Sequence, residues 1–346
     1  MAKALLPLPL CWSRRSDLLP YAWGGPLATG QLRAKPEHFQ VTELLEVDFS
    51  AAGEFDWVYV EKNGLSTPEA AELLQQFSVA KDISYSGLKD KDAVTRQWFS
   101  LHMLGQASAD WQNFNHSGLR VLDSQRHQRK LRRGTHRYNQ FTLVLSGVSA
   151  DELSERVQCV AEQGFPNYFG EQRFGHGGNN LDQARRWLSG GRKVSRFKRG
   201  LWLSVLRSHL FNCVLAERVQ QANWNQPLPG DLFCLGDGNS VFQEADDELA
   251  AARVNAGEIH PSGPLPGSVG RIWVESAALE LEREVLATEQ DTIAALAARR
   301  VDAARRPLRV IPKALTITGV AEGCQLEFSL PKGCFATALV RELIDY

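Results

Sequence analysis

The chain has 346 residues, of which 43% are hydrophobic and 23% charged, and 39 Lys and Arg residues almost balance 40 Asp and Glu. This length allows two domains, or one domain that carries a large insertion, and the composition is typical of a soluble globular protein. The net charge of −1 argues against a uniformly basic nucleic-acid-binding protein, so any basic surface must come from local clusters.

The start of the chain and its cysteines indicate a cytoplasmic protein. Pro7 and Pro9 interrupt the apolar run at residues 4–11, so we expect no signal peptide. No stretch approaches the ~20 apolar residues that a membrane span needs. The six cysteines form no C-x-x-C pair, which predicts reduced thiols and no zinc site.

The first 80 residues predict short strands and one helix. We expect strands over residues 40–47 and 56–60. Thr67 should be the N-cap of a helix that runs to about Ser78, because a proline follows it in the first turn. The apolar residues that this helix should bury are Ala71, Leu74 and Phe77.

A turn with alternating charges, Lys-Asp-Lys-Asp at residues 89–92, joins two further strands expected over residues 82–88 and 94–101. Catalytic residues concentrate on loops that strands hold in place. Asp90 lies between two lysines and should stay ionised at neutral pH, since nearby cations favour the charged form. An ordinary solvated turn is the alternative, because Asp is a common turn residue.

Basic residues gather in three parts of the chain. Residues 124–150 and 183–216 contain no acidic residue, and a third cluster lies at residues 299–306. The first stretch leads into an aromatic strand predicted over residues 138–145. Cations beside flat rings are what binding of RNA phosphates and unstacked bases requires, although an isolated charge run is usually a solvated face. We expect the three clusters to line one cleft that grips an RNA backbone.

The middle of the chain is predicted to be rich in helices, and its end returns to strands. A capping box at Ser149 starts a helix that Gly164 ends. Further helices are expected over residues 206–219, 246–255 and 275–306, a hairpin turn at 236–239, a loop at 261–267, strands over 308–317 and 325–330, and a last helix over 336–344. Strand-rich ends around a helix-rich middle predict one domain inserted into another, with a boundary near Phe165.

Five segments carry recognisable motifs: PEHF at residues 36–39, GLKDKDAVTRQ at 87–97, NQF at 139–141, PNYFGEQRFG at 166–175 and FSLPKGCFAT at 328–337. In this order they resemble the TruD family of tRNA pseudouridine synthases, and the resemblance covers about residues 30–344. Two positions depart from the family pattern. Ser86 stands where alanine is common, and Cys334 where serine is common.

The resemblance implies an α+β fold. A pseudouridine-synthase catalytic domain with a mixed, antiparallel-rich sheet would comprise residues 1–164 and 310–346. An inserted, helix-rich α/β domain specific to the family would comprise residues 165–309. The resemblance further implies isomerisation of a uridine in tRNA, uridine 13 for this family, without a metal or an organic cofactor. The partner is then tRNA, and we expect a monomer with no membrane contact.

The resemblance also implies roles for individual residues. Asp90 would be the nucleophile, attacking either the base or the sugar. Lys89 would help to keep it ionised, although an ordinary solvated lysine is the alternative. Asn139 would hydrogen-bond the uracil edge, although capping of a strand edge is the alternative. The aromatic residues expected to line the pocket and stack on the base, with plain core packing as the alternative, are Phe39, Phe141 and Phe335.

Phe141 occupies the position where many pseudouridine synthases have a tyrosine. That side chain cannot act as a base here, so another group or a water molecule must move the proton from C5. Two other functions compete with this interpretation. An RNA-binding protein without chemistry would explain the basic stretches but not the Lys-Asp-Lys turn. A glycoside hydrolase needs two carboxylates that flank the bond, and Asp90 and Asp92 lie on one turn.

Overall fold

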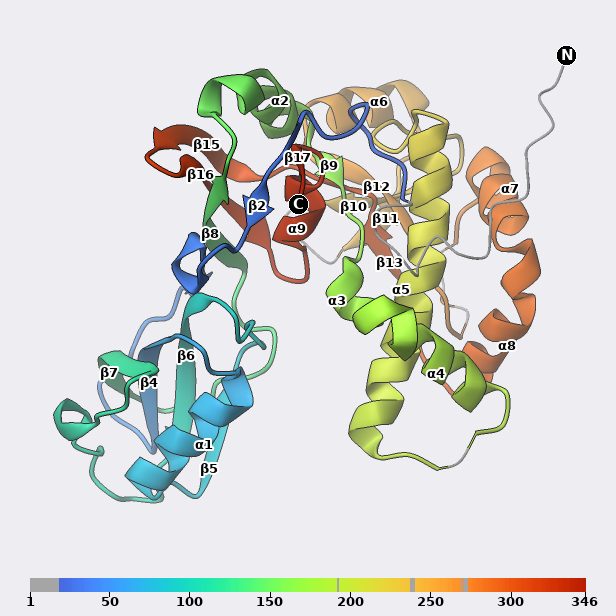
Figure 1. The fold of residues 1–346 in the computed structure, drawn as a ribbon. Coiled ribbons are helices and arrows are strands. Elements are labelled where there is room, and N and C mark those ends of the chain that lie inside the picture. Colours follow the sequence, from blue (N-terminus) through green and yellow to red (C-terminus); the bar gives the residue numbers. More distant parts are fainter. Residues whose placement is uncertain (1–18, 192, 237–239, 269, 271–272) are drawn as a thin grey trace, which may run out of the picture. The chain divides into compact units, whose positions relative to one another are not determined.

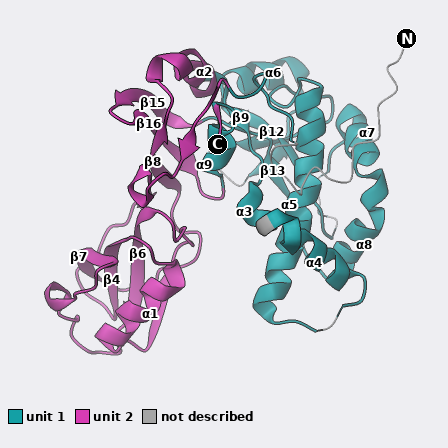
Figure 2. Ribbon diagram, viewed as in Figure 1, with its two compact units in different colours: residues 1–26, 162–311, 334–343 teal, residues 27–161, 312–333, 344–346 magenta. Residues whose placement is uncertain are grey.

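The computed structural model describes residues 19–191, 193–236, 240–268, 270 and 273–346. The chain divides into two compact units (Figure 2). Unit 1 contains residues 1–26, 162–311 and 334–343, and unit 2 contains residues 27–161, 312–333 and 344–346. The apolar run at residues 4–11 lies outside the described residues. Within the described parts of the chain, no helix combines the length and apolar character of a membrane span.

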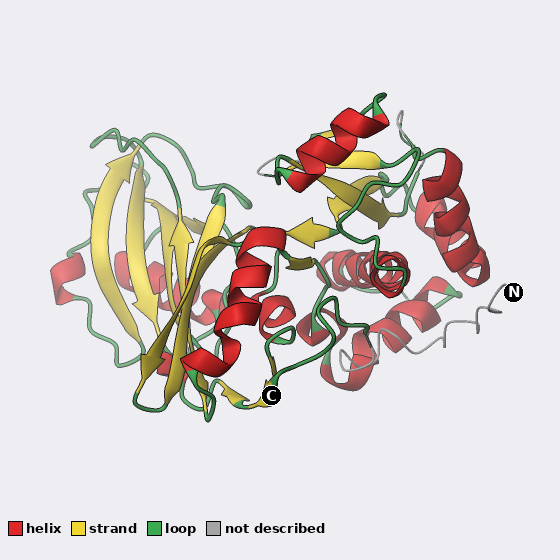
Figure 3. Ribbon diagram, turned by 90° about the horizontal axis from the view of Figure 1, so that it is seen from above, coloured by secondary structure: helices red, strands yellow, loops and turns green. Residues whose placement is uncertain are grey.

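Unit 2 is built on a mixed sheet with the strand order β15-β16-β8-β3-β6-β4-β7, to which β2 adds beside β8 and β5 beside β6 (Figures 1 and 3). The strands are β2 (Gln31–Leu32), β3 (Phe39–Leu44), β4 (Phe55–Lys62), β5 (Asp82–Tyr85), β6 (Val94–His102), β7 (Leu119–His127), β8 (Tyr138–Ser146), β15 (Lys313–Val320) and β16 (Gly323–Pro331). Among the described strands of this sheet, β3 and β6 pair in parallel, and the other ladders are antiparallel. The predicted antiparallel-rich sheet is confirmed.

The two ends of this unit meet through the short parallel pair β1 (Ala28–Thr29) and β17 (Ile344–Asp345). Helix α2 (Ala150–Gln163) leads along the chain from unit 2 into unit 1. It begins as predicted, because the Glu152 N–H donates to Ser149 Oγ at 3.3 Å. Short 3-10 turns lie at η2 (Pro36–His38) and η3 (Trp111–Asn113).

Helix α1 (Thr67–Ser78) packs against the β4–β6 part of the sheet. Its N-cap is Ser66 and not Thr67, because Ser66 Oγ accepts the Glu69 N–H while the Glu69 carboxylate accepts the Ser66 N–H. Ala71 and Leu74 are buried as predicted. The prediction for Phe77 is wrong: its side chain is 39% exposed and lies at the rim of the core, against Trp111 and Phe114.

Unit 1 is organised around the long helix α5 (Arg196–Gln220), which packs on a four-stranded sheet of order β11-β10-β12-β13. Its other elements are α3 (Glu171–Phe174), η4 (His176–Gly178), α4 (Asn179–Leu188), β9 (Phe165–Pro166), β10 (Leu232–Leu235), β11 (Val241–Gln243), α6 (Asp247–Asn255), β12 (Ile259–Leu265), α7 (Ser276–Val285), η5 (Ala287–Glu289), α8 (Gln290–Ala298), β13 (Ala304–Pro307), β14 (Arg309–Val310) and α9 (Ala336–Val340).

Two predictions for unit 1 need correction. Residues 261–267 were expected to form a loop, but they belong mostly to strand β12, in which Pro261 pairs with β10 and Pro264 with β13. The helical region expected over residues 275–306 ends at Ala298, and residues 304–307 pair as β13 with β12. Strands β10 and β11 pair as a hairpin, whereas the turn residues 237–239 lie outside the described residues.

Candidate active site

Asp90 lies on the turn between β5 and β6 (Figure 1). This is the turn that the Lys-Asp-Lys-Asp sequence predicted. The Asp90 side chain is 41% exposed, and its Oδ2 atom accepts a hydrogen bond from Arg33 Nη2 at 2.9 Å. Arg33 follows β2 and has a φ of 67°, in the left-handed region that non-glycine residues rarely adopt. The carboxylate therefore faces accessible space while an arginine fixes its direction.

The same arginine connects Asp90 to an aromatic cluster within unit 2. The Arg33 guanidinium carbon lies 3.9 Å from the centroid of the Phe39 ring. Phe39 packs edge-to-face against Phe141 at 6.3 Å, and Phe141 stacks on Phe328 at 5.3 Å. Phe39 and Phe141 are both buried. Cation–π contact and stacking thus form a continuous path from the carboxylate into the sheet.

Lys89 points inward from the turn. Its side chain is 6% exposed, and its Nζ atom lies 2.8 Å from Glu43 Oε2 on β3. Burial raises the pKa of Glu43, and the Lys89 ammonium opposes that rise. Removing one partner of a buried ion pair strongly destabilises a protein. The pair with Glu43 therefore ties Lys89 and its turn to the central part of the sheet.

His136 and Ser86 form a second attachment beside this ion pair. Ser86 Oγ lies 2.5 Å from His136 Nδ1 and accepts the His136 N–H at 3.0 Å. Burial, together with the positive charges of Lys89 and Lys332, lowers the pKa of His136 to about 4. The imidazole is therefore neutral at pH 7 and serves as a hydrogen-bonding group. A Cβ atom on Gly87 would lie 3.0 Å from His136 Cε1, so the close approach favours glycine there.

Two further contacts hold the backbone of the turn. Thr67 Oγ1 accepts the Lys89 N–H at 2.9 Å and donates to Gln97 Oε1 at 3.0 Å. Gln97 Nε2 in turn donates to the Gly87 carbonyl oxygen at 3.2 Å. Thr67, the first residue of α1, and Gln97, within β6, are both fully buried, so they hold the residues before Asp90 in a fixed conformation.

The remaining predicted site residues lie in different places. Asn139 is buried on β8, directly opposite Glu43 on β3. Its Oδ1 atom has no hydrogen-bond partner among the described residues. Phe335 belongs to unit 1, where its half-buried ring packs edge-to-face against Phe169 at 5.9 Å. The structure therefore brings Asp90, Lys89, Phe39, Phe141 and Asn139 together in unit 2, while Phe335 belongs to the other unit.

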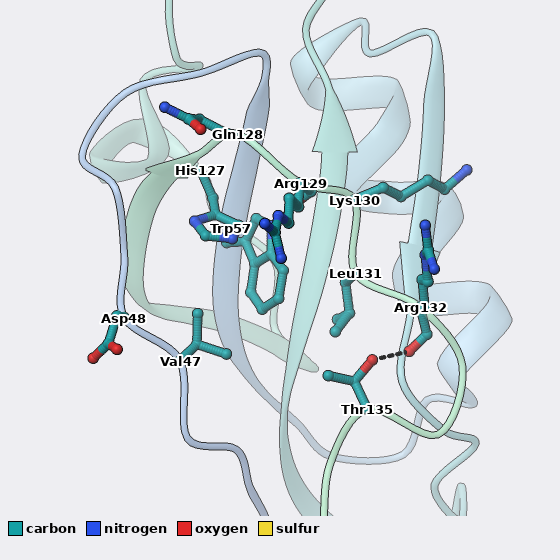
Figure 4. Close-up of a pocket in the computed structure, with 10 residues that line it drawn as sticks. All are labelled: Val47, Asp48, Trp57, His127, Gln128, Arg129, Lys130, Leu131, Arg132 and Thr135. Carbon is teal, nitrogen blue, oxygen red and sulfur yellow. Dashed lines mark hydrogen bonds between the residues drawn. The ribbon is translucent and has the colours of Figure 1, made fainter.

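The first basic stretch is attached to the Asp90 turn, because the Gly134 N–H donates to the Ser86 carbonyl oxygen at 2.7 Å. A cavity of about 720 Å³ lies between residues 127–135 and the segment at Val47 and Asp48, with Trp57 at its base (Figure 4). In Figure 4, Arg129 lies beside Trp57. The exposed cations of this stretch are Arg129, Lys130, Arg132, Arg133 and Arg137.

Not every basic residue of the three clusters faces solvent. Arg126 binds the buried carboxylate of Asp56 at 2.8 Å. In the second cluster the exposed cations are Arg186, Lys193, Arg196, Lys198 and Arg199. The prediction for the third cluster is wrong for two of its members. Arg305 pairs with Glu282 at 2.7 Å, and Arg306 stacks on Phe169 and donates to the Asn167 side chain.

Sequence reasoning missed three residues of the site: Arg33, Glu43 and His136. Arg33 and Asp90 are 57 positions apart, and the pairing of β2 with β8 and of β5 with β6 places them on one sheet. The sequence pointed only weakly to Glu43, as the acidic residue of strand β3, in which buried and partly buried side chains alternate. Across the described ranges, no three His, Cys, Asp or Glu side chains gather closely enough to hold a metal ion.

Comparison with known proteins gives one consistent family. A sequence profile of TruD, tRNA pseudouridine synthase D, matches residues 16–183 and 179–343. A tRNA pseudouridine synthase D of Pseudomonas putida (strain W619) is 44% identical over 339 residues, which cover 94% of each chain. The protein of that name from Pseudomonas aeruginosa (strain LESB58) is 43% identical over 341 residues, covering 95% of this chain and 94% of its relative.

A solved structure shares the fold. It is the crystal structure of a putative tRNA pseudouridine synthase D (TruD) from Methanosarcina mazei, with a TM-score of 0.71 and 19% identity over 94% of this chain and 95% of that one. Together with the sequence matches, the mixed sheet is that of a tRNA pseudouridine synthase. The chain belongs to the TruD family of tRNA pseudouridine synthases.

Proposed function

We propose that this enzyme isomerises a uridine of tRNA, uridine 13, to pseudouridine, with Asp90 as the nucleophile. The observation that carries the proposal is the position of Asp90. It is a half-exposed carboxylate that Arg33 orients, on a turn whose backbone Thr67 and Gln97 hold. The turn also carries the motif by which the chain resembles its family.

The reaction detaches uracil from C1′ and reattaches it through C5, so an N-glycoside becomes a C-glycoside. The base must leave the stack, which costs a few kcal/mol. A carboxylate can then capture the intermediate covalently. In this proposal Asp90 forms a bond either to the base or to C1′, and the same bond breaks when C5 replaces N1 at the sugar. The C5 proton leaves to a water molecule or to a group other than Phe141.

Arg33 and Lys89 have different parts in this proposal. Arg33 directs the carboxylate, because its guanidinium binds Asp90 and rests on the Phe39 ring. Lys89 adds a positive charge one residue away and anchors the turn through Glu43.

We also propose that a flipped uracil meets Phe39 and Phe141 and that Asn139 binds its edge, whereas the role expected for Phe335, in unit 1, stays a prediction. The contact between Phe39 and Phe141, and the link from Phe39 through Arg33 to Asp90, support the first two residues. The Asn139 Oδ1 atom, which has no partner in the described structure, supports the amide. The aromatic rings and the enclosed base would keep water from ending the reaction as hydrolysis.

The substrate's phosphates would be bound by the exposed cations of the first two basic clusters. Residues 129–133 are favoured because Gly134 and His136 attach that segment directly to the turn of Asp90. Arg300 is the exposed cation of the third cluster. We propose that the enzyme acts in the cytoplasm as a monomer.

The test is pseudouridine formation in unmodified tRNA transcripts, with Asp90→Asn beside the wild type and Asp92→Asn as the matched control on the same turn. We expect one uridine to be converted, a loss of at least about 10³-fold for Asp90→Asn with tRNA binding retained, and near-normal activity for Asp92→Asn. A protein that binds tRNA but converts no uridine would instead be an RNA-binding protein. Full activity of Asp90→Asn would exclude Asp90 as the nucleophile.

A further inference from the structure

Lys62 is a fully buried lysine beneath the turn of Asp90. It is the last residue of β4, and its exposed fraction is 0%. Its Nζ atom donates to the main-chain oxygen of Asp90 at 2.5 Å and to that of Leu65 at 2.7 Å. Lysine is almost never fully buried unless it is paired, so these two carbonyl groups account for its position.

The contact to Asp90 differs from the other contacts of the turn. Thr67 and Gln97 hold the Lys89 N–H and the Gly87 carbonyl group, which both precede Asp90. Arg33 holds the carboxylate itself. Lys62 binds the peptide that follows the Cα atom of Asp90. Its hydrogen bond therefore limits rotation of the residue whose side chain is proposed to react.

We propose that Lys62 is a positioning residue for the reaction, which fixes the main chain of Asp90 so that the carboxylate meets the uridine in the reacting geometry. The inference rests on the proposed role of Asp90. Lys62 lies below the turn, is closed off from solvent and touches no substrate. Its effect on the reaction passes through the Asp90 peptide.

The chemistry of the site explains why a lysine is kept there. Burial lowers the pKa of Lys62 to about 8, with Asp90 and Glu69 favouring its charge and Lys89 opposing it. Well-packed apolar side chains often replace buried charges with neutral or favourable effects on stability. A lysine in this place costs stability, and the gain is a donor with enough reach to bind two carbonyl oxygens at once.

A positioning role predicts a loss of rate and little loss of affinity. Displacement of a reacting group by about 1 Å can reduce the rate about 10²-fold. Lys62→Met keeps most of the side-chain volume but removes the donor. Lys81→Met is the matched control, because Lys81 is an exposed lysine of the same unit that lies away from the turn of Asp90.

The experiment measures the single-turnover rate of pseudouridine formation at saturating full-length protein, the Kd for tRNA and the thermal unfolding temperature of each variant. We expect Lys62→Met to lower the rate roughly 10- to 100-fold while its Kd stays within about twofold. Lys81→Met should keep its rate within about twofold. Lys62→Arg, which restores a donor, should be faster than Lys62→Met.

Three results would overturn the inference. They are a folded Lys62→Met protein with the wild-type rate, a Lys62→Arg protein no faster than the Met variant, and loss of the fold in both variants, which would assign Lys62 to folding alone. Asp90→Asn, measured in the same assay, separates this failure from failure of the proposed function. If Asp90→Asn is inactive and Lys62→Met is fully active, only the role of Lys62 is wrong.

Discussion

His136 and Lys89 show how buried polar residues support the candidate nucleophile. Lys89 joins the turn to Glu43 through a buried ion pair, and His136 joins it to the basic segment through Ser86. Neither side chain is directed at solvent. Asp90, on the turn that both of them hold, keeps an accessible carboxylate. The residues around it are therefore specialised, with some of them fixing the backbone and Arg33 directing the side chain.

The pKa of His136 leads to a prediction about stability and pH. It is about 4 in the folded protein, below its usual 6.5. Between these values the unfolded chain binds more protons, so the stability that this depressed pKa provides is complete above pH 6.5 and is lost as the pH falls towards 4. We expect the destabilisation caused by His136→Asn to be largest near pH 7 and to shrink on acidification.

Urea unfolding of the wild type and of His136→Asn between pH 4.5 and 7.5 measures this difference. His116→Asn serves as the control, because His116 is only half-buried and lies in the loop before β7. A difference between wild type and His136→Asn that stays constant across this pH range would contradict the burial of a neutral imidazole.

At the scale of elements, the N-terminus of α1 links helix stability to the site. Ser66 and Glu69 satisfy each other's backbone N–H groups, and Thr67, the next residue, holds the Lys89 N–H. The end of the helix that holds the turn of Asp90 is therefore itself capped. The sequence placed this helix correctly but assigned the cap to Thr67, one residue late.

We predict that Ser66→Ala lowers the free energy of unfolding by about 1 kcal/mol, because the Glu69 N–H loses its acceptor. Chemical denaturation measures the change. Ser154→Ala, at an exposed position of α2, should stay within about 0.5 kcal/mol of the wild type. Equal effects of the two substitutions would show that the cap has no special role.

Other elements show which predictions local sequence can support. Periodicity and capping residues predicted α2, α6 and β8 close to their observed bounds. Residues 261–267 were mispredicted because three prolines and two glycines are typical of a loop. Pairing with β10 and β13 outweighs that preference, and it also ends the last helical region before residue 304.

For the whole molecule, the net charge of −1 is the sum of unevenly distributed charges, because the basic residues are concentrated in clusters. The first two basic clusters keep most of their cations at the surface, whereas Arg305 and Arg306 of the third stabilise unit 1 from within. Compact unit 1 also takes in residues 1–26 and 334–343. The catalytic and inserted domains over residues 1–164 with 310–346 and over 165–309 stay a prediction.

The surface cations predict steep salt dependence of tRNA binding. The logarithm of the Kd should rise linearly with the logarithm of salt concentration, since each neutralised phosphate releases counterions. Replacing Arg132 and Arg133 with Ala should reduce that slope by about 2. Lys81→Ala, an exposed lysine elsewhere in unit 2, is the control. Binding that does not change with salt would contradict a phosphate-binding role for these residues.

The sequence by itself determined the family, the sheet-based fold and the turn that carries Asp90, because these depend on contiguous motifs and local periodicity. Only the tertiary structure decided which groups serve that turn. These groups, Arg33, Glu43, Lys62 and His136, come from four separate segments of the chain. Arg33 and Lys62 contact Asp90 itself, whereas Glu43 contacts Lys89 and His136 contacts Ser86. Strand pairing brings these partners together across 28 to 57 positions of the chain. Burial then decides the rest, because a cation such as Lys62 or Arg306 looks like a solvated residue in the sequence until the fold encloses it.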